Sequence, residues 1–528
     1  MYLKEEKKIW IASGKGGAEP IYLLPKMMNR HGLISGATGT GKTTTMKAMA
    51  EALSEMGTPT FLADIKGDVS GMCQPGQQSD TISDRVKSMG IQDFAFRGFP
   101  VTFFDFFGKK GVPVRITVST MGPILLGRIL GLNDTQTGVL QIVFKIADDK
   151  GLLMLDFKDL RSMLSYVGEN AKSFTTQYGN VTSASVGAIQ RSLLSLEAAG
   201  AEYFFGEPEL DLNDMLAQDE QGFGMINILD CTALSQDPLL YSTFLLWMLS
   251  ELYEMMPEVG NPKKPKMVFF FDEAHLLFND APKALLQKIE QIVRLIRSKG
   301  VGVYFVTQNP SDIPNTVLSQ LGNKVQHALR PYTPNDQKAI KAAAASFRAN
   351  PDFNSETAIG ELANGEALIA ALDEEGAPQV VQRGFIFPLR CGGGVADPEL
   401  VERITKASPL YSKYAQAIDR YSAFEALEEA ATKEQQDALE AQRQKEQAAL
   451  EAQRQKEQDA QEKQRQKELL QREKAAAAAK PKTSTAKKST SRSTTASPFE
   501  KALASTMTEV GKSVGKELLR GLFGTYKR

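Results

Sequence analysis

The sequence is poor in the residues from which metal centres and disulfide frameworks are built. Its 528 residues include only three histidines and three cysteines, Cys73, Cys231 and Cys391. The cysteines lie far apart and form no C-x-x-C pair, which argues against a zinc knuckle or a disulfide-stabilised scaffold and favours a reducing compartment. The scarcity of histidine likewise argues against a histidine-based metal site.

Long apolar runs and an excess of charge are also absent. No apolar stretch approaches the roughly 20 residues of a membrane-spanning helix, and residues 1–10 are charged where a signal peptide would be apolar. The net charge is -1, so the composition as a whole indicates no polyanionic partner. We therefore expect a cytoplasmic protein of about three domains with no transmembrane segment.

One glycine-rich stretch carries the strongest signal. Residues 36–43 match the phosphate-binding pattern G-x-x-x-x-G-K-[ST] in full, between a strand-like run at residues 31–35 and a helical pattern at residues 44–56. Such glycines let backbone N–H groups turn towards an anion, and the helix N-terminus adds its positive dipole end. The stretch predicts a nucleoside triphosphate site. Its expected contacts are Gly36, Ala37, Thr38, Gly39, Thr40, Gly41, Lys42, Thr43 and Thr44.

Two of these residues have separate expected roles. Lys42 would reach the β- and γ-phosphates, and the Thr43 hydroxyl would ligate Mg²⁺. A second strand pattern, residues 60–64, runs into Asp64-Ile65-Lys66-Gly67-Asp68. At the carboxyl end of a strand these charges would face the ligand crevice of an open α/β sheet. An ordinary polar turn is the other interpretation, and both stay open.

A third strand pattern ends in two adjacent acids. Residues 267–271 form the apolar run of a buried central strand, and Asp272 and Glu273 follow it. Beside a P-loop, we expect Asp272 to hold Mg²⁺ and Glu273 to orient and deprotonate the attacking water. The Asp-Glu-Ala-His string also matches DEAH-box helicases, but the sequence shows no other motif of that class. The pair favours hydrolysis over binding alone.

Candidates for sensing and neutralising the transferred phosphate follow. Residues 302–307 predict a strand, and Gln308 at its exit is placed to sense the γ-phosphate or the lytic water. Arg294 and Arg297 lie near the end of the preceding helical pattern, and Arg330 follows a later strand. Each arginine is either a surface ion-pair partner or a finger for a neighbouring subunit's nucleotide.

The remaining patterns complete an α/β protein with a helical insertion at residues 125–205. Further strands are predicted at residues 9–12, 21–24, 101–107, 114–119, 224–230 and 324–329. A closing hairpin is expected at residues 366–372 and 379–387, so the core would end near residue 390.

The order of these motifs resembles that of the HerA/FtsK superfamily of hexameric DNA-pumping ATPases. The closest resemblance is to the bacterial branch with a HerA-like helicase C-terminal domain, of the YjgR type. The motifs that carry it are the P-loop, residues 64–68, residues 269–273 and Thr307-Gln308-Asn309-Pro310. The resemblance covers residues 1–390 and implies a RecA-like sheet, a homohexameric ring, ATP and Mg²⁺ as cofactors, and DNA translocation or unwinding. The implied catalytic residues are Glu273, Gln308 and a neighbour's arginine, with Arg297 the first choice and Arg330 the second.

Three features depart from that family or leave its activity unsupported. HerA proper carries a small N-terminal β-barrel, for which the residues before this P-loop are too few. The sequence also has no winged helix or transmembrane segment of the FtsK kind. The core shows no cluster of basic residues that would mark a duplex-binding surface, although a ring channel can assemble such a surface from scattered lysines and arginines. DNA translocation is therefore implied by the resemblance alone.

Beyond residue 390 the composition changes. Residues 391–420 are expected to be a linker, and residues 421–479 carry a repeat of eleven residues, which predicts an extended polar helix with a thin apolar seam. Intrahelical ion pairs favour a single helix over a coiled coil. Residues 480–498 predict a disordered basic linker, and residues 499–528 an amphipathic helix. This basic tail would bind nucleic acid, anionic lipid, a partner protein or its own ring.

Three hypotheses follow for the whole chain. The first is a ring-shaped ATPase that moves DNA. The second is a nucleotide-gated scaffold that recruits a protein partner through its C-terminal helix. The third is a small-molecule kinase, which would be a monomer and would transfer the phosphoryl group to something other than water.

Overall fold

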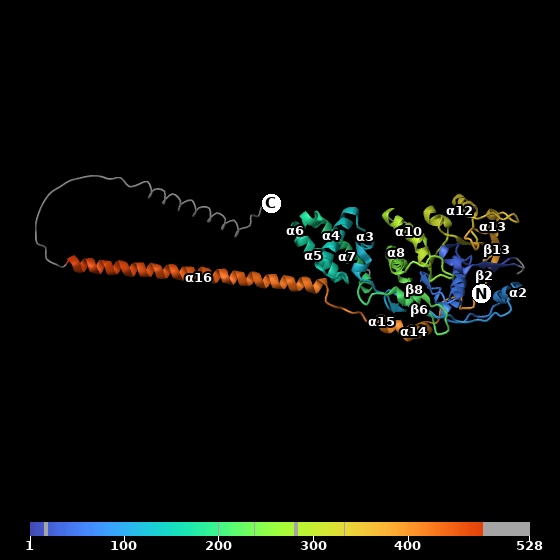
Figure 1. Cartoon of the computed structure of the whole chain (residues 1–528), viewed down its shortest axis with the longest axis horizontal. Coiled ribbons are helices and arrows are strands. Elements are labelled where there is room, and N and C mark those ends of the chain that lie inside the picture. Colours follow the sequence, from blue (N-terminus) through green and yellow to red (C-terminus); the bar gives the residue numbers. More distant parts are fainter. Residues whose placement is uncertain (15–18, 199, 237, 279–282, 332, 479–528) are drawn as a thin grey trace. The chain divides into compact units, whose positions relative to one another are not determined.

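The computed structural model describes residues 1–14, 19–198, 200–236, 238–278, 283–331 and 333–478 (Figure 1). One sheet of thirteen strands organises it. The strands are β1 (Tyr2–Leu3), β2 (Lys8–Ser13), β3 (Pro20–Leu23), β4 (Gly32–Ser35), β5 (Thr60–Asp64), β6 (Val101–Asp105), β7 (Val112–Pro113), β8 (Ile226–Asp230), β9 (Met267–Phe271), β10 (Val301–Thr307), β11 (Asn323–Gln326), β12 (Glu366–Ala370) and β13 (Gln382–Ile386).

The strand order confirms the predicted α/β fold with a RecA-like, mostly parallel sheet. The order is β1-β2-β13-β12-β11-β4-β10-β9-β5-β8-β6-β7, with β3 paired to β2. The strands from β11 to β7 are all parallel. The antiparallel part contains the predicted hairpin, β12 with β13, and the short N-terminal strands. The carboxyl ends of β4, β10, β9 and β5 therefore share one edge of the sheet.

The central strands are buried on both faces because helices cover both. Every residue of β9 and β10 is buried. On β9, Val268 and Phe270 pack in one hydrophobic cluster with α1 (Lys42–Glu55), as alternation along a strand requires. Phe269 and Phe271 pack in the other cluster with α8 (Pro238–Met255) and α10 (Lys283–Ile296). Within the described ranges no helix is both long enough and apolar enough to cross a bilayer.

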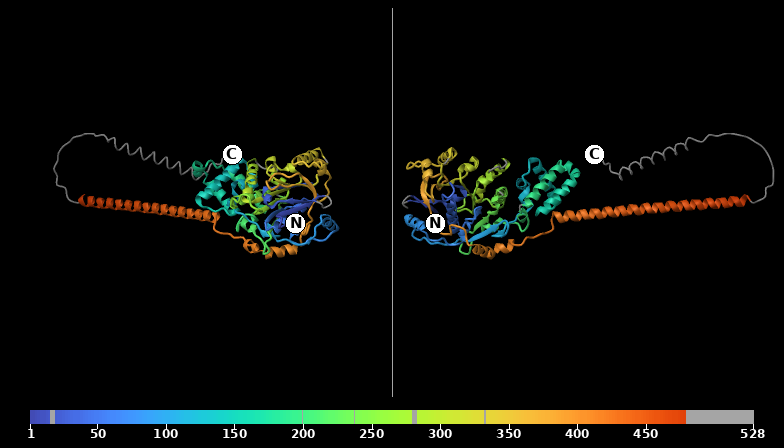
Figure 2. Two further views of the ribbon diagram at one scale, coloured as in Figure 1. Left: turned by 45° about the vertical axis from the view of Figure 1, so that its right-hand side comes forward. Right: turned by 180° about the vertical axis from the view of Figure 1, so that it is seen from behind.

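The predicted helical insertion is a lobe of its own between β7 and β8. Figures 1 and 2 show its helices gathered beside the sheet. They are α3 (Val118–Ile129), α4 (Asp134–Lys150), α5 (Phe157–Glu169), α6 (Ala171–Tyr178) and α7 (Ser183–Ala198). The lobe begins earlier than residue 125, and the strand predicted at residues 114–119 is wrong. The Thr117 hydroxyl accepts a hydrogen bond from the N–H of Thr120 and starts α3 there.

Residues 391–420 differ from the expected linker. They contain α14 (Pro398–Ala407) and α15 (Pro409–Tyr414), and the Cys391 and Tyr414 side chains are buried. Residues 1–435 form a first compact unit, and the described residues from 436 onwards belong to a second. The predicted polar helix is α16 (Ala423–Ala478). The predictions for residues 480–498 and 499–528 lie outside the described residues. The other α-helices described are α2 (Asp80–Ser88), α9 (His275–Phe278), α11 (Asn315–Leu318), α12 (Pro334–Ala345) and α13 (Ser355–Glu361).

Candidate functional site

The glycine loop joins the carboxyl end of β4 to the start of α1. Gly39 and Gly41 have φ angles of 77° and 117°, in the left-handed region that favours glycine. A Cβ at Gly41 would also lie 3.2 Å from His327 Cε1. Helix α1 begins at Lys42 without a side-chain cap, so its first N–H groups and its positive dipole end face the loop. This geometry suits an anion bound by backbone N–H groups.

Lys42 lies inside this loop. Its Nζ donates to the carbonyl oxygens of Gly36 at 2.7 Å and Ala37 at 3.1 Å. Burial, followed by the positive charge of Lys66, lowers the pKa of Lys42. An incoming phosphate would therefore relieve an unfavourably buried charge. Thr43 and Thr44 lie in the first turn of α1, where hydroxyls can reach a phosphate or its metal ion.

The two acids follow β9 at the same edge of the sheet, with β10 between them and the P-loop strand. Asp272 is buried, and its Oδ1 accepts the N–H of Glu273 at 2.9 Å. Burial raises the pKa of Asp272 to about 6, against the lowering effect of Lys66. Glu273 has a φ of 47°, an uncommon left-handed value for a residue with a side chain. Backbone strain of this kind clusters at functional sites.

Glu273 has cationic and amide partners. Its Oε1 lies 2.7 Å from Lys66 Nζ, and its Oε2 lies 3.3 Å from His275 Nδ1 and 3.5 Å from Gln308 Nε2. Burial alone would raise the pKa of Glu273, but the hydrogen bond and charge of Lys66, with His275 and Gln308, lower it overall. The carboxylate is therefore ionised at neutral pH. A group in this state can accept a proton from a bound water.

Gln308 connects the acids to the P-loop. Its Oε1 accepts the Thr38 hydroxyl at 3.4 Å, and its Nε2 donates to Glu273. The parallel register explains this meeting, because Thr307 at the end of β10 pairs with Ser35 at the end of β4. The structure thus brings the predicted P-loop, acid pair and glutamine together at one edge.

The segment after β5 contains both a polar turn and a charge that faces the nucleotide site, so each of the two interpretations holds for part of it. The Asp64 carboxylate accepts the backbone N–H groups of Gly67, Asp68 and Val69, so Asp64 builds a polar turn. Lys66 instead points to the acid pair, 4.0 Å from Asp272 and closer to Glu273. Lys66 was only one charge among several in the sequence, and its role as the partner of Glu273 is visible only in the structure.

Sequence reasoning missed His327. This buried side chain lies beneath the P-loop, with its Nε2 at 2.8 Å from the Thr45 hydroxyl and its Nδ1 at 3.0 Å from the Glu366 carbonyl oxygen. Burial lowers the pKa of His327 to about 4, so the ring is neutral at physiological pH. A lone histidine after a strand gave no signal of this support role.

The donor set fits Mg²⁺ rather than a metal held wholly by protein. Within the described part of the chain, no three His, Cys, Asp or Glu side chains are grouped to hold an ion. Mg²⁺ typically keeps several waters and binds one or two protein oxygens together with substrate phosphates. Asp272, directly after β9, and Thr43, in the first turn of α1, carry oxygens of this kind.

The two candidate arginines lie in different settings. Arg330 donates from its guanidinium to the carbonyl oxygens of Gly360 and Leu362, which occupies it within its own chain. Arg297 lies in the turn that leads into β10, at the amino end of that strand. The P-loop follows the carboxyl end of the parallel neighbour β4, so Arg297 lies at the opposite edge of the sheet.

Arg297 lines a basic depression of about 340 Å³ at this opposite edge. No aspartate or glutamate lines it, and none of its cations is within ion-pair distance of a carboxylate among the residues described. This corrects the expectation that the core has no basic cluster. The sequence hides the cluster because its members come from separate segments. They are Arg30, Arg294, Arg297, Lys324 and Arg348.

Two curated relatives are archaeal. The DNA double-strand break repair helicase HerA of Sulfolobus acidocaldarius is 20% identical over 347 residues, which cover 65% of this chain and 62% of that protein. The protein of the same name from Sulfurisphaera tokodaii is 27% identical over 209 residues, 38% of this chain and 39% of that protein. The chain therefore matches less than two thirds of the length of these relatives.

Two solved structures are also similar. The plasmid coupling protein TrwB in complex with the ATP analogue ADPNP aligns with a TM-score of 0.49 and 13% identity, covering 74% of this chain and 92% of that one. VirB4 of Thermoanaerobacter pseudethanolicus aligns with a TM-score of 0.46 and 14% identity, covering 72% and 96%. The model of the family described as "Helicase HerA-like C-terminal" matches residues 11–528. Because this match spans nearly the whole sequence, the protein belongs to the HerA-like helicase C-terminal family.

Proposed function

We propose that the protein is a Mg²⁺-dependent ATP hydrolase that works as a homohexameric ring and couples hydrolysis to DNA translocation or unwinding. The observation that best supports hydrolase activity is a chain of hydrogen bonds from Thr38 of the P-loop through Gln308 to Glu273. It joins a phosphate-binding loop to an ionised carboxylate, which is the pairing that water-mediated cleavage of a triphosphate requires. The kinase alternative has no comparable observation in its favour.

The residues divide the reaction among them. Backbone N–H groups of the P-loop and Lys42 bind the phosphates, and Asp272 and Thr43 would hold Mg²⁺. When bound, Mg²⁺ supplies positive charge that offsets the charge developing on the phosphate oxygens. Glu273 accepts the proton of the attacking water, and Lys66 holds this carboxylate ionised and in place. Gln308 positions the water between the base and the γ-phosphate.

The transition state also needs a guanidinium, and we assign Arg297 of a neighbouring subunit. Arg330 is already bonded to two carbonyl oxygens of its own chain. In a head-to-tail ring, one edge of each subunit faces the opposite edge of the next. The P-loop and Arg297 lie at opposite edges, so such a ring can bring them together. The uncompensated charge of the basic depression suits a neighbour's triphosphate.

Mixing two inactive variants tests this assignment. Lys42→Ala lacks a working P-loop but keeps Arg297, and Arg297→Gln has the reverse defect. Neither alone should hydrolyse ATP, whereas an equimolar mixture should regain turnover at the roughly one quarter of interfaces that pair the two intact halves. Because the two variants must assemble together, subunit exchange is verified by co-purification of differently tagged chains. A co-assembled mixture that stays inactive refutes the assignment.

The DNA part of the proposal is supported by the family and by the name of the Sulfolobus relative, a DNA repair helicase. ATP turnover by the purified protein is measured with and without double-stranded DNA, at two salt concentrations. Stimulation that fades as salt rises would place phosphate-backbone contacts within the working cycle. Turnover that does not respond to DNA would be consistent with an ATP hydrolase and would contradict DNA translocation.

A nucleotide-gated scaffold is the second candidate, because α16 exposes large apolar side chains along a polar helix. Leu439 and Leu450 are 50% and 53% exposed, eleven positions apart. Removing residues 436–528 distinguishes the candidates and leaves the first compact unit intact. A motor keeps DNA-stimulated turnover after this truncation, whereas a scaffold loses its partner.

The described cysteines are all unpaired, and we place the protein in the reducing cytoplasm.

A further inference from the structure

Residues 390–425, here called the strap, leave the sheet after β13 and end in the first turn of α16. The strap contains α14 and α15 and lies wholly within the first compact unit. One end contacts the P-loop helix, and the other contacts the helical insertion. No residue of the strap belongs to the nucleotide site described above.

The first end is held by two charged side chains of α1. Glu51 is completely buried, and its Oε1 accepts the backbone N–H groups of Arg390 at 3.1 Å and Cys391 at 2.9 Å. Lys47, equally buried, donates to the carbonyl oxygen of Gly393 at 2.9 Å. Both side chains belong to the helix that starts in the P-loop. These hydrogen bonds connect α1 directly to the strap backbone, so a displacement of α1 would pull on the strap.

The middle of the strap crosses to the base of the insertion. Arg115, which follows β7, donates to the Tyr414 carbonyl oxygen at 2.7 Å. The buried Tyr414 hydroxyl donates to Asp214, and Lys413 pairs with the same carboxylate at 2.7 Å. These contacts hold α15 against both chain segments through which the insertion joins the sheet.

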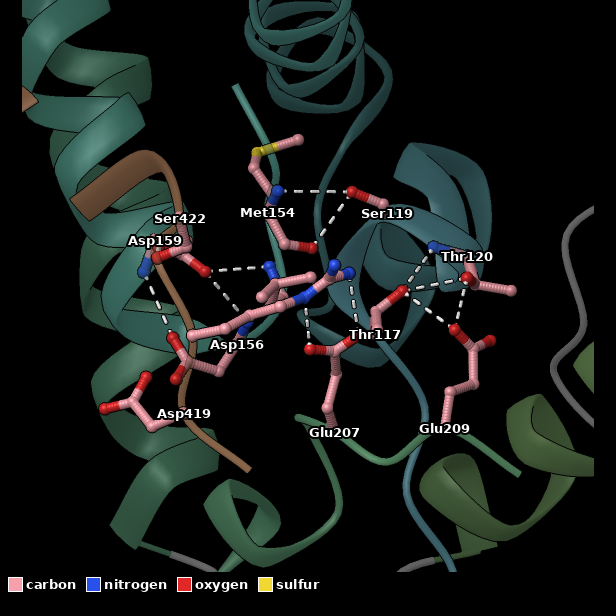
Figure 3. Close-up of polar contacts among 12 residues, drawn as sticks. Thr117, Ser119, Thr120, Met154, Asp156, Asp159, Glu207, Glu209, Asp419 and Ser422 are labelled. Atoms are coloured by element: carbon pink, nitrogen blue, oxygen red, sulfur yellow. Dashed lines mark hydrogen bonds and ion pairs between the residues drawn. The ribbon is translucent and has the colours of Figure 1, made fainter. Parts of the chain in front are cut away.

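The second end converges on Asp159, a completely buried carboxylate in the first turn of α5 (Figure 3). Its Oδ2 accepts the N–H of Leu155 at 2.7 Å and the N–H of Asp156 at 3.2 Å, and the second of these bonds belongs to the capping box of α5. Its Oδ1 accepts the Ser422 hydroxyl at 2.5 Å and the N–H of Phe424 at 2.9 Å. One carboxylate thus caps two helices, α5 of the insertion and α16.

Ion pairs reinforce this junction on its exposed side. Arg420 makes a bidentate pair with Glu207, at 2.6 and 2.8 Å. Lys158, next to Asp159, pairs with Asp419 at 2.7 Å. Figure 3 shows the strap passing beside the insertion helices, with the Asp159 side chain directed to Ser422. The start of α16 is therefore fixed to the insertion and not merely tethered to it.

We propose that the strap couples nucleotide occupancy at the P-loop to the position of the insertion and the anchored start of α16. The inference rests on the proposed nucleotide site. Nucleotide binding reorganises the N-terminus of α1, and Lys47 and Glu51 carry the change into the strap. A load on α16 then reaches the P-loop by the same contacts in reverse, because coupling between two sites is reciprocal.

The test measures both directions of this coupling in the full-length chain. Hydrogen exchange of residues 417–425 is followed with and without a non-hydrolysable ATP analogue and Mg²⁺. We expect the analogue to change exchange rates in this stretch. The dissociation constant of a fluorescent form of the analogue is then measured for Arg420→Gln and Ser422→Ala, and we expect a change of at least about fivefold.

Lys406→Gln serves as the control. Lys406 is an exposed strap residue, and its one ion pair among the residues that the structure describes is with Glu402 of its own helix. Its substitution should therefore leave the dissociation constant within about twofold. Arg420 is half exposed, so its variant should fold even if the Ser422 variant does not. Faster exchange at residues 417–425 in Arg420→Gln with unchanged nucleotide affinity overturns the coupling.

Failure of the inference and failure of the proposed function give different results. If the wild-type chain binds the analogue but its hydrogen exchange at residues 417–425 is unchanged, the coupling is refuted and the nucleotide site stands. If the wild-type chain does not bind the analogue, the nucleotide site is refuted, and the coupling, which depends on it, is refuted as well.

Discussion

Glu273→Gln separates the chemistry of the proposed hydrolase from its binding of nucleotide. The substitution keeps the length and shape of the side chain and removes the negative charge that accepts the proton of water. A positioned general base contributes about 10²–10⁴-fold to a rate, so turnover should fall by that factor. The contact with Gln308 at 3.5 Å can be kept by an amide oxygen.

The fold and the nucleotide affinity should change little in this variant. The pair that is lost joins Glu273 to Lys66, which is 39% exposed, so solvent screening limits the cost to about 1 kcal/mol or less. Glutamine tolerates the φ of 47° no worse than glutamate, so the backbone strain is the same in both proteins. Nucleotide is bound by the P-loop, which the substitution does not touch. The dissociation constant should therefore stay within about twofold.

The assay compares phosphate release at saturating ATP with the affinity for a fluorescent ATP analogue. Glu258→Gln is the matched control, because Glu258 is 65% exposed and makes a long surface pair, 3.7 Å from Lys299. That variant should retain wild-type turnover. Turnover of Glu273→Gln within tenfold of wild type, in protein that still binds the analogue, would refute the assignment of Glu273 as the base.

Three further predictions test the surroundings of the site. Lys66→Met removes the cation that lowers the pKa of Glu273 and leaves burial to raise it, so the acid limb of the pH–turnover profile should move to higher pH. His327 has a pKa of about 4 when folded and about 6.5 when unfolded, so the stability that it contributes above pH 6.5 is lost as the pH falls towards 4, by about 3 kcal/mol. In urea denaturation at pH 7.5 and 4.5, His327→Gln should lose less stability than wild type between the two, and an equal loss would contradict the argument. Lys47→Met leaves the carbonyl oxygens of Asp68, Gly392 and Gly393 without their shared donor, that of Gly392 in a buried position, and should lower the free energy of unfolding by about 1–3 kcal/mol. An unchanged midpoint in the same denaturant would show that those oxygens find other partners.

The sequence by itself determined the elements and the chemistry that depend on near neighbours along the chain. The P-loop is a contiguous pattern, and the five consecutive apolar residues before Asp272 are typical of a strand buried on both faces, as β9 is. The helical period located the insertion and α16 to within a few residues. Where local signals competed, the prediction failed. Residues 114–119 looked like a strand, but the side chain of Thr117 caps a helix there.

Tertiary structure decided which of these elements meet. Only the sheet order places β10 between the P-loop strand and the acids, so that Gln308 contacts both sides. Only folding brings Lys66 to Glu273 and gathers four further cations around Arg297. Only folding also holds the expected linker after residue 390 against α1 and Asp159. Each of these contacts joins residues far apart in the sequence. Local propensity and hydrophobic period describe one element at a time, and the free energy that selects among pairings of elements comes from burial and hydrogen bonding between them.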